Sequence, residues 1–183
     1  MPIPQNKKEA MMLDHENRNT YWQDAIEAET GQLFEYKVFK DTGKNAAVPK
    51  GYQLIKLHIV FDVKQSLKWK ATIVAHGDMT DPPQEAVYSG VASLWSLCIV
   101  CLLVELNGSK LTGGDIGNAC LEAHTSEKVC VCAGLEFGPL EGHLLAIEKV
   151  LCGPHTSGTR IYAKFADTLC ALGFAPTYAD PNV

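Results

Sequence analysis

The chain has 183 residues, of which 46% are hydrophobic and 20% charged, and its formal net charge at pH 7 is -5. This composition is that of an ordinary globular chain long enough to bury a core, and we expect one domain or two incomplete lobes. The acidic balance excludes a surface that is cationic throughout, so nucleic-acid contacts are expected only where lysines cluster locally.

The first part of the chain is polar. Residues 1–18 lack the apolar core of a signal peptide, and we expect them to form a flexible lead. Trp22 and Ile26 then open an apolar pattern at helical spacing. This pattern predicts a helix over about residues 20–30, weakened at Gly31 because glycine is a poor helix former.

Two strictly alternating segments follow, at residues 52–63 and 68–76. Only Gln-Ser-Leu and one lysine separate them, which predicts a hairpin with one apolar face and one cationic face. From Lys37 to Lys70 the chain holds eight lysines and two aspartates, a local balance of +6. We interpret this stretch as a basic lobe on an acidic body, and a solvated lysine-rich hairpin without a partner is the alternative.

The most apolar run of the chain lies at residues 91–106 and predicts a buried helix over about 90–106. It is shorter than the roughly 20 residues that a membrane crossing needs, so we expect no membrane contact and a cytoplasmic or nuclear location. Further along we expect a short strand at 110–116, a helical turn at 118–123, strands at 128–133 and 143–151, and an amphipathic helix over 157–172.

The seven cysteines form an odd set without secretory context, so free thiols are expected. Cys98 and Cys101 have a spacing typical of zinc ligands, and Cys130 and Cys132 would complete a four-thiolate site. The first pair lies in an apolar helical run and the second alternates along an apolar strand, where cysteine behaves as a small hydrophobe. Core packing is the favoured interpretation, and a zinc module is the alternative.

Several motifs occur in one order along the chain. They are YWQDAIEAE at 21–29, GYQLIKLHIVFDVK at 51–64, KATIVAHGDMTDPP at 70–83 and GDIGNACLEA at 114–123. In this order, and over roughly residues 20–183, the chain resembles the reverse transcriptase domain of copia-type retrotransposons. The resemblance implies an α+β fold of reverse-transcriptase-like fingers and an incomplete palm, with 19–183 as a truncated domain, 19–109 mainly fingers and 110–183 partial palm.

The same resemblance implies RNA-directed DNA synthesis by two-metal nucleotidyl transfer with Mg²⁺. Its partners would be an RNA or DNA template-primer, deoxynucleoside triphosphates and the remainder of the retrotransposon polyprotein. Asp115 is similar to the family's first catalytic, metal-binding carboxylate, and the backbone carbonyl of Ile116 would be an accessory metal ligand. Lys70 and Cys120 match positions beside the incoming nucleotide. For nucleic-acid contacts we expect the hairpin lysines Lys56, Lys64 and Lys68.

The chain also departs from the family pattern. It contains no Asp-Asp dipeptide, although the family carries its other two catalytic carboxylates in a Tyr-Val-Asp-Asp-like hairpin that would follow Val183. Thr72 replaces a basic residue beside the triphosphate, and Cys120 replaces an aromatic residue that excludes the ribose 2′-hydroxyl. We therefore expect a fragment that does not polymerise DNA on its own. The alternative is a non-catalytic nucleic-acid-binding remnant that uses the lysine-rich hairpin.

Overall fold

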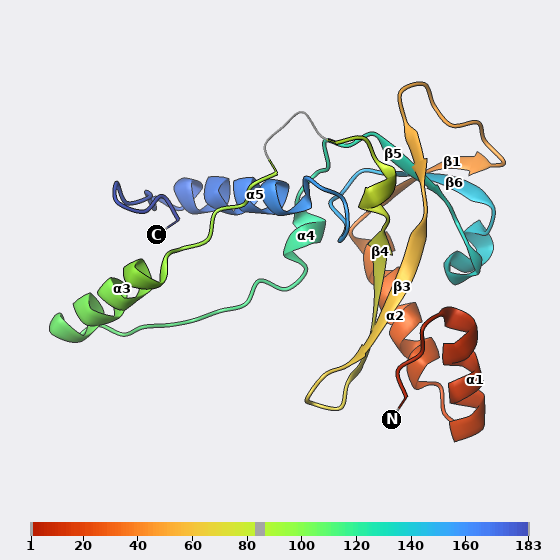
Figure 1. Cartoon of the computed structure of the whole chain (residues 1–183), viewed down its shortest axis with the longest axis horizontal. Coiled ribbons are helices and arrows are strands. Elements are labelled where there is room, and N and C mark those ends of the chain that lie inside the picture. Colours follow the sequence, from red (N-terminus) through yellow and green to blue (C-terminus); the bar gives the residue numbers. More distant parts are fainter. Residues whose placement is uncertain (1, 83–86, 183) are drawn as a thin grey trace.

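The computed structural model describes residues 2–82 and 87–182 and shows a four-stranded sheet, a two-stranded hairpin and several helices (Figure 1). The predicted α+β class is confirmed. The elements in chain order are α1 (Lys7–Asn17), α2 (Tyr21–Glu35), β1 (Phe39–Lys44), β2 (Gln53–Ile55), β3 (Leu57–Val63), β4 (Trp69–Ala75), the 3-10 turn η1 (Gly77–Met79), α3 (Leu94–Leu106), α4 (Ala119–Glu122), β5 (Val129–Cys132), the 3-10 segment η2 (Leu135–Leu140), β6 (His143–Ile147) and α5 (Ser157–Ala171).

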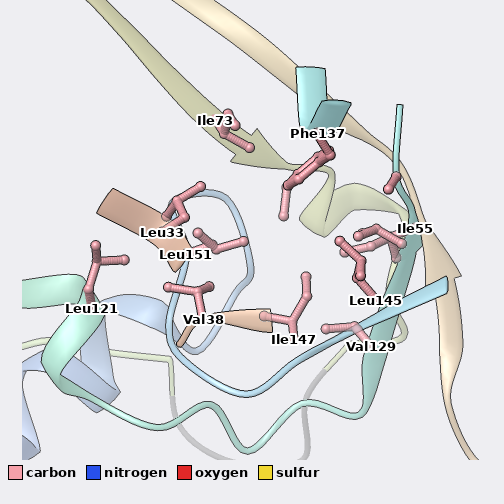
Figure 2. Packing of buried hydrophobic residues seen from close by; sticks show 13 residues of the cluster. Leu33, Val38, Ile55, Ile73, Leu121, Val129, Phe137, Leu145, Ile147 and Leu151 are labelled. Atoms are coloured by element: carbon pink, nitrogen blue, oxygen red, sulfur yellow. The ribbon is translucent and has the colours of Figure 1, made fainter. Parts of the chain in front are cut away.

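The four-stranded sheet is mixed, with strand order β1-β6-β5-β2. β6 pairs antiparallel with both β1 and β5, whereas β2 joins β5 in parallel. The central strand β6 is buried from Leu144 to Ile147 because its neighbours cover its edges and other elements cover its faces. Figure 2 shows the main core on this sheet, where Leu33 of α2 and Phe137 of η2 pack with Leu145 and Ile147 of β6.

The predicted hairpin is confirmed. β3 and β4 pair antiparallel with Phe61 opposite Ala71 and Asp62 opposite Lys70. Phe61, Ala71 and Ile73 are buried, and Lys70 is exposed, as strand alternation requires. The single strand expected over 52–63 is divided at Lys56, because β2 pairs with β5 while β3 pairs with β4.

The prediction that residues 1–18 form a flexible lead is wrong, because Lys7–Asn17 form helix α1. Asn6 caps this helix by accepting the backbone N–H of Glu9 at 3.0 Å. Ala10 is fully buried in a second core cluster with Trp22, Ile26, Phe61 and Ala71 of α2 and the hairpin. The sequence signal that was overlooked is the Asn-x-x-Glu spacing of residues 6–9, which resembles a capping box.

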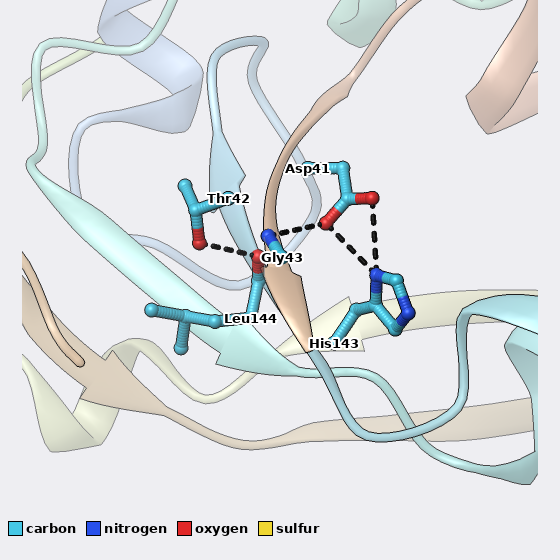
Figure 3. A network of polar contacts seen from close by, with 5 residues as sticks. All are labelled: Asp41, Thr42, Gly43, His143 and Leu144. Carbon is cyan, nitrogen blue, oxygen red and sulfur yellow. Dashed lines mark hydrogen bonds and ion pairs between the residues drawn. The ribbon is translucent and has the colours of Figure 1, made fainter. Parts of the chain in front are cut away.

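β1 is a polar edge strand that alternation did not predict (Figure 3). The Thr42 hydroxyl donates to the Leu144 carbonyl at 2.7 Å. The Asp41 carboxylate accepts the backbone N–H of Gly43 at 2.8 Å and lies 3.0 Å from the His143 ring nitrogen Nδ1. The hydrogen bond from Gly43, followed by that from His143, lowers the pKa of Asp41. Polar contacts between β1 and β6 thus hold β1 in the sheet, although β1 lacks the apolar alternation of an ordinary strand.

The apolar segment 94–106 is helical as predicted, but its burial was predicted wrongly. None of the residues of α3 is buried, and Trp95 is 81% exposed. In Figure 1, α3 and α5 lie to one side of the sheets, and residues 107–118 return from α3 as an extended segment. The sheets therefore leave every residue of α3 at least partly exposed. No helix in the described part of the chain has the length and apolarity that crossing a bilayer needs.

Other predictions for the second half have mixed outcomes. The helical turn is confirmed as α4, the two strands as β5 and β6, and the last helix as α5, although β6 ends at Ile147 and not at residue 151 as predicted. The strand predicted at 110–116 is wrong, since these residues have no regular structure and make no strand pairing in the described chain. Their glycine-rich sequence has no apolar alternation that would secure a place in a sheet.

Candidate functional site

A cavity of about 390 Å³ brings together side chains from three separate parts of the chain. α2 contributes Glu29, the hairpin contributes lysines, and the segment before α4 contributes Asp115 and Ile116. The lysines that line it are Lys64, Lys68 and Lys70. Five predicted site residues therefore surround one space, although they are far apart in the sequence.

The hairpin positions the three lysines by simple strand geometry. The Lys64 N–H donates to the Lys68 carbonyl at 3.0 Å and closes the turn, so these two side chains start from adjacent backbone positions. The turn also places Leu67 in the left-handed region at φ 58°. Lys70 lies two residues further along β4 and is exposed on the face opposite the buried Ala71. The three lysine side chains therefore lie at one end of the hairpin.

α2 supplies a carboxylate that the sequence analysis did not assign to the site. Ala25, Ala28, Glu29 and Gln32 line the cavity, and their spacing places them on one face of the helix. Burial raises the pKa of Glu29, while a hydrogen bond from the Ile73 N–H at 3.0 Å and the charge of Lys70 oppose this rise. The i, i+3, i+4, i+7 pattern was the available signal, but it is also the pattern of an ordinary packed helix.

Asp115 lies in the irregular segment before α4 and is exposed to solvent. Asp115 is therefore not held by the strand that was predicted over 110–116, although it lines the larger cavity. Asn118 adopts a left-handed conformation at φ 58°, and its carbonyl accepts the N–H of Leu121 at 2.8 Å. This turn begins α4 and so connects the exposed segment to the buried Leu121.

A second cavity of about 270 Å³ adjoins the first and shares Glu29, Lys70 and Ile116 with it. Cys120 and Cys152 line this second space together with Thr72. Cys120 and Lys70, both predicted beside a nucleotide, are therefore brought together. Lys56 is exposed at the start of the hairpin and lines neither cavity.

The residues present do not fit a pair of magnesium ions. Mg²⁺ prefers a near-octahedral shell of oxygen ligands, and two ions need several carboxylates. The larger cavity offers Asp115 and Glu29 beside three ammonium groups, which repel a divalent cation. Among residues 2–82 and 87–182, no group of three or more His, Cys, Asp or Glu side chains is arranged to hold a metal. The side chains that line the larger cavity therefore suit an anionic ligand better than a metal cation.

The proposed four-thiolate zinc site is likewise not formed among the described residues. Cys130 is buried in β5, which agrees with core packing, and burial raises the pKa of its thiol. Cys98, Cys101 and Cys132 are exposed, so the core-packing interpretation is wrong for them. The reason for the first two is the exposure of α3 as a whole.

No family model, curated protein or solved structure matches the chain. A functional interpretation therefore depends on the cavities and on the order of the sequence motifs.

Proposed function

We propose that the chain is the fingers and partial palm of a copia-type reverse transcriptase, and that its larger cavity binds the phosphates of a nucleotide or primer-template without polymerising DNA. The observation that carries the proposal is the meeting of Lys64, Lys68 and Lys70 with Asp115 around one cavity. Lys64, Lys70 and Asp115 belong to three separate sequence motifs, at 51–64, 70–83 and 114–123.

Charge and size favour a phosphate ligand. Three ammonium groups face two carboxylates, and burial disfavours the charged form of one of them, Glu29. Lysine binds phosphate as a point charge with three donors. A volume of about 390 Å³ lies within the range of small-molecule sites. The absence of a fitting metal-ligand set in this cavity is why binding, and not polymerisation, is proposed for the chain alone.

The test is a binding titration of the full chain with a fluorescent deoxynucleoside triphosphate. Lys70→Gln should weaken binding about 10- to 150-fold, because a charge-assisted hydrogen bond contributes about 1.5–3 kcal/mol. Lys56→Gln is the matched control, since it removes the same charge from an exposed hairpin position outside the cavity. Equal losses of triphosphate affinity in Lys70→Gln and Lys56→Gln, or no triphosphate binding by the unmodified chain, would contradict the cavity assignment. Template-dependent primer extension should be absent throughout.

A second candidate function is nucleic-acid binding along the whole hairpin, with lysines both inside and outside the cavity taking part. The exposed placement of Lys56, Lys64 and Lys68 along the hairpin favours it. Under this function, binding to a primer-template duplex weakens with salt, and each neutralised lysine reduces the logarithmic salt slope by about one. Lys56→Gln would then weaken duplex binding as much as Lys70→Gln does. A salt-independent signal would rule this candidate out.

A further inference from the structure

Two cysteines that the proposed phosphate site does not use lie side by side. Cys120 belongs to α4, and Cys152 belongs to the segment between β6 and α5. Both line the cavity of about 270 Å³, and the interaction between the two side chains shifts their pKa values in opposite directions. Sequence spacing gave no reason to pair them, because the two residues belong to different elements.

The backbone holds Cys152 firmly on the edge of β4. Its carbonyl accepts the Ala75 N–H at 2.9 Å, and Cys152 forms a parallel bridge with Val74. Gly153 follows with φ 115°, and a Cβ atom there would collide with the Ala75 carbonyl. Only glycine permits this close approach of the two backbones.

α4 is attached to the segment that leads to Cys152. The Val150 N–H donates to the Ala123 carbonyl at 2.9 Å, and the Lys149 ammonium donates to the Leu121 carbonyl at 3.1 Å. Leu121 is itself buried in the main core. Both cysteines therefore come from backbone that is fixed to the same part of the core, so their thiols are kept together.

The two thiols differ in exposure and in acidity. Cys152 is exposed, whereas Cys120 is half-buried. The hydrogen bond with Cys120 lowers the pKa of Cys152, and the charge of Lys70 acts in the same direction. The same hydrogen bond, together with burial, raises the pKa of Cys120. Because the thiolate is the nucleophile, Cys152 is the group expected to react first.

We propose that Cys120 and Cys152 form a peroxide-sensitive pair that closes to a reversible disulfide between α4 and the β4 edge. The Cys152 thiolate attacks one oxygen of hydrogen peroxide, the O–O bond breaks, and the departing hydroxide takes a proton to leave as water. The Cys120 sulfur then attacks the resulting sulfenic sulfur. The S–O bond breaks, the S–S bond forms, and the Cys120 proton leaves with the second water. Two thiols are thus oxidised while one peroxide is reduced to two waters, and an added dithiol reverses the reaction by exchange.

The disulfide would change the wall of the neighbouring cavity. Asp115 and Ile116 lie just before α4, and Lys70 lines the cavity that contains both cysteines. A covalent bond from α4 to the β4 edge would fix this segment relative to the lysine. The pairing itself does not depend on whether the larger cavity binds phosphate.

Peptide mapping of the full native chain tests the pair directly. After treatment with one equivalent of hydrogen peroxide, free thiols are blocked and the chain is digested with trypsin. Cleavage after lysine and arginine leaves Cys120 alone in peptide 111–128 and Cys152 alone in peptide 150–160. We expect these two peptides to be cross-linked, with two of the seven thiols lost and both recovered by dithiothreitol.

Two controls distinguish an organised pair from random oxidation. Cys170→Ser removes an exposed cysteine elsewhere and should leave the cross-link unchanged, whereas Cys152→Ser should abolish it. Oxidation in guanidinium chloride should scatter the bonds over other pairs. Cys120→Ala should slow alkylation of Cys152 at pH 7, because the pKa of Cys152 rises when its interaction with Cys120 is lost. A native chain that forms other pairs instead, or that carries over-oxidised Cys152 without the cross-link, would overturn the proposal.

Discussion

The Asp41 carboxylate is a single side chain whose charge supports a sheet edge. Its pKa is lowered by hydrogen bonds from Gly43 and His143, so the folded state favours the ionised form. The stabilisation is present above the ordinary pKa of 3.8 and is lost as pH falls through the lower folded value. Asp41→Asn should therefore reduce the free energy of unfolding at pH 7, and the difference from the unmodified chain should shrink at pH 3.

Urea denaturation at the two pH values measures this effect. Asp167→Asn, on the exposed face of α5, is a control of the same chemistry. If Asp41→Asn produced the same loss at pH 3 as at pH 7, the ionised carboxylate would not be the stabilising group.

Some residues of the candidate site could be predicted from the sequence and others could not, because some positions follow from local sequence patterns and others from packing between distant elements. Lys64, Lys68 and Lys70 follow from strand alternation, a local property, and their common cavity agrees with the hairpin prediction. Glu29 was missed because its place in the cavity, and its raised pKa, depend on how α2 packs against β4. Cys152 was missed as a neighbour of Cys120 for the same reason, since no local spacing encodes that contact.

At the level of whole elements, α1 and α2 are joined by one buried carboxylate. Asp14 accepts the backbone N–H groups of Trp22 at 3.0 Å and Gln23 at 2.9 Å, in the first turn of α2. It acts as the N-terminal cap that Thr20 does not provide through its own side chain. Asp14→Ala should destabilise the chain by about 1–2 kcal/mol, the cost of losing such a cap.

Thermal or urea unfolding measures this loss, with Glu16→Ala on the exposed face of α1 as the control. Asp14→Asn keeps an acceptor oxygen and should cost less than Asp14→Ala. Equal stabilities for the Asp14→Ala and Glu16→Ala variants would show that the carboxylate does not cap α2.

Elements with strong apolar periodicity were predicted well, and polar elements were not. β3, β4, β5 and α5 each carry a pattern that defines their type without outside help. α1 is stabilised by packing against α2, and β1 is stabilised by pairing with β6. The failure at α3 is of another kind. Its helical pattern is real, but composition alone does not establish what covers an apolar helix.

At the scale of the whole molecule, the described residues form two core clusters that meet at the hairpin. Ile59 of β3 packs against both the main core on the mixed sheet and the smaller cluster around Trp22. α3 contributes no buried residue to either. The stability of the chain should therefore depend on the sheet and hairpin, and very little on the apolar helix that dominates the hydropathy of the sequence.

A pair of leucine truncations tests this distribution. Leu145 lies fully buried on the central strand β6, whereas Leu102 on α3 is 58% exposed. Leu145→Ala should cost about 2–5 kcal/mol, a large share of the 5–15 kcal/mol typical of a folded domain. Leu102→Ala should change stability by less than about 0.5 kcal/mol, because it removes little buried surface. Both values come from urea unfolding at neutral pH. A loss at Leu102 comparable to that at Leu145 would mean that α3 is packed against the rest of the chain in solution, since only burial makes a leucine truncation so costly.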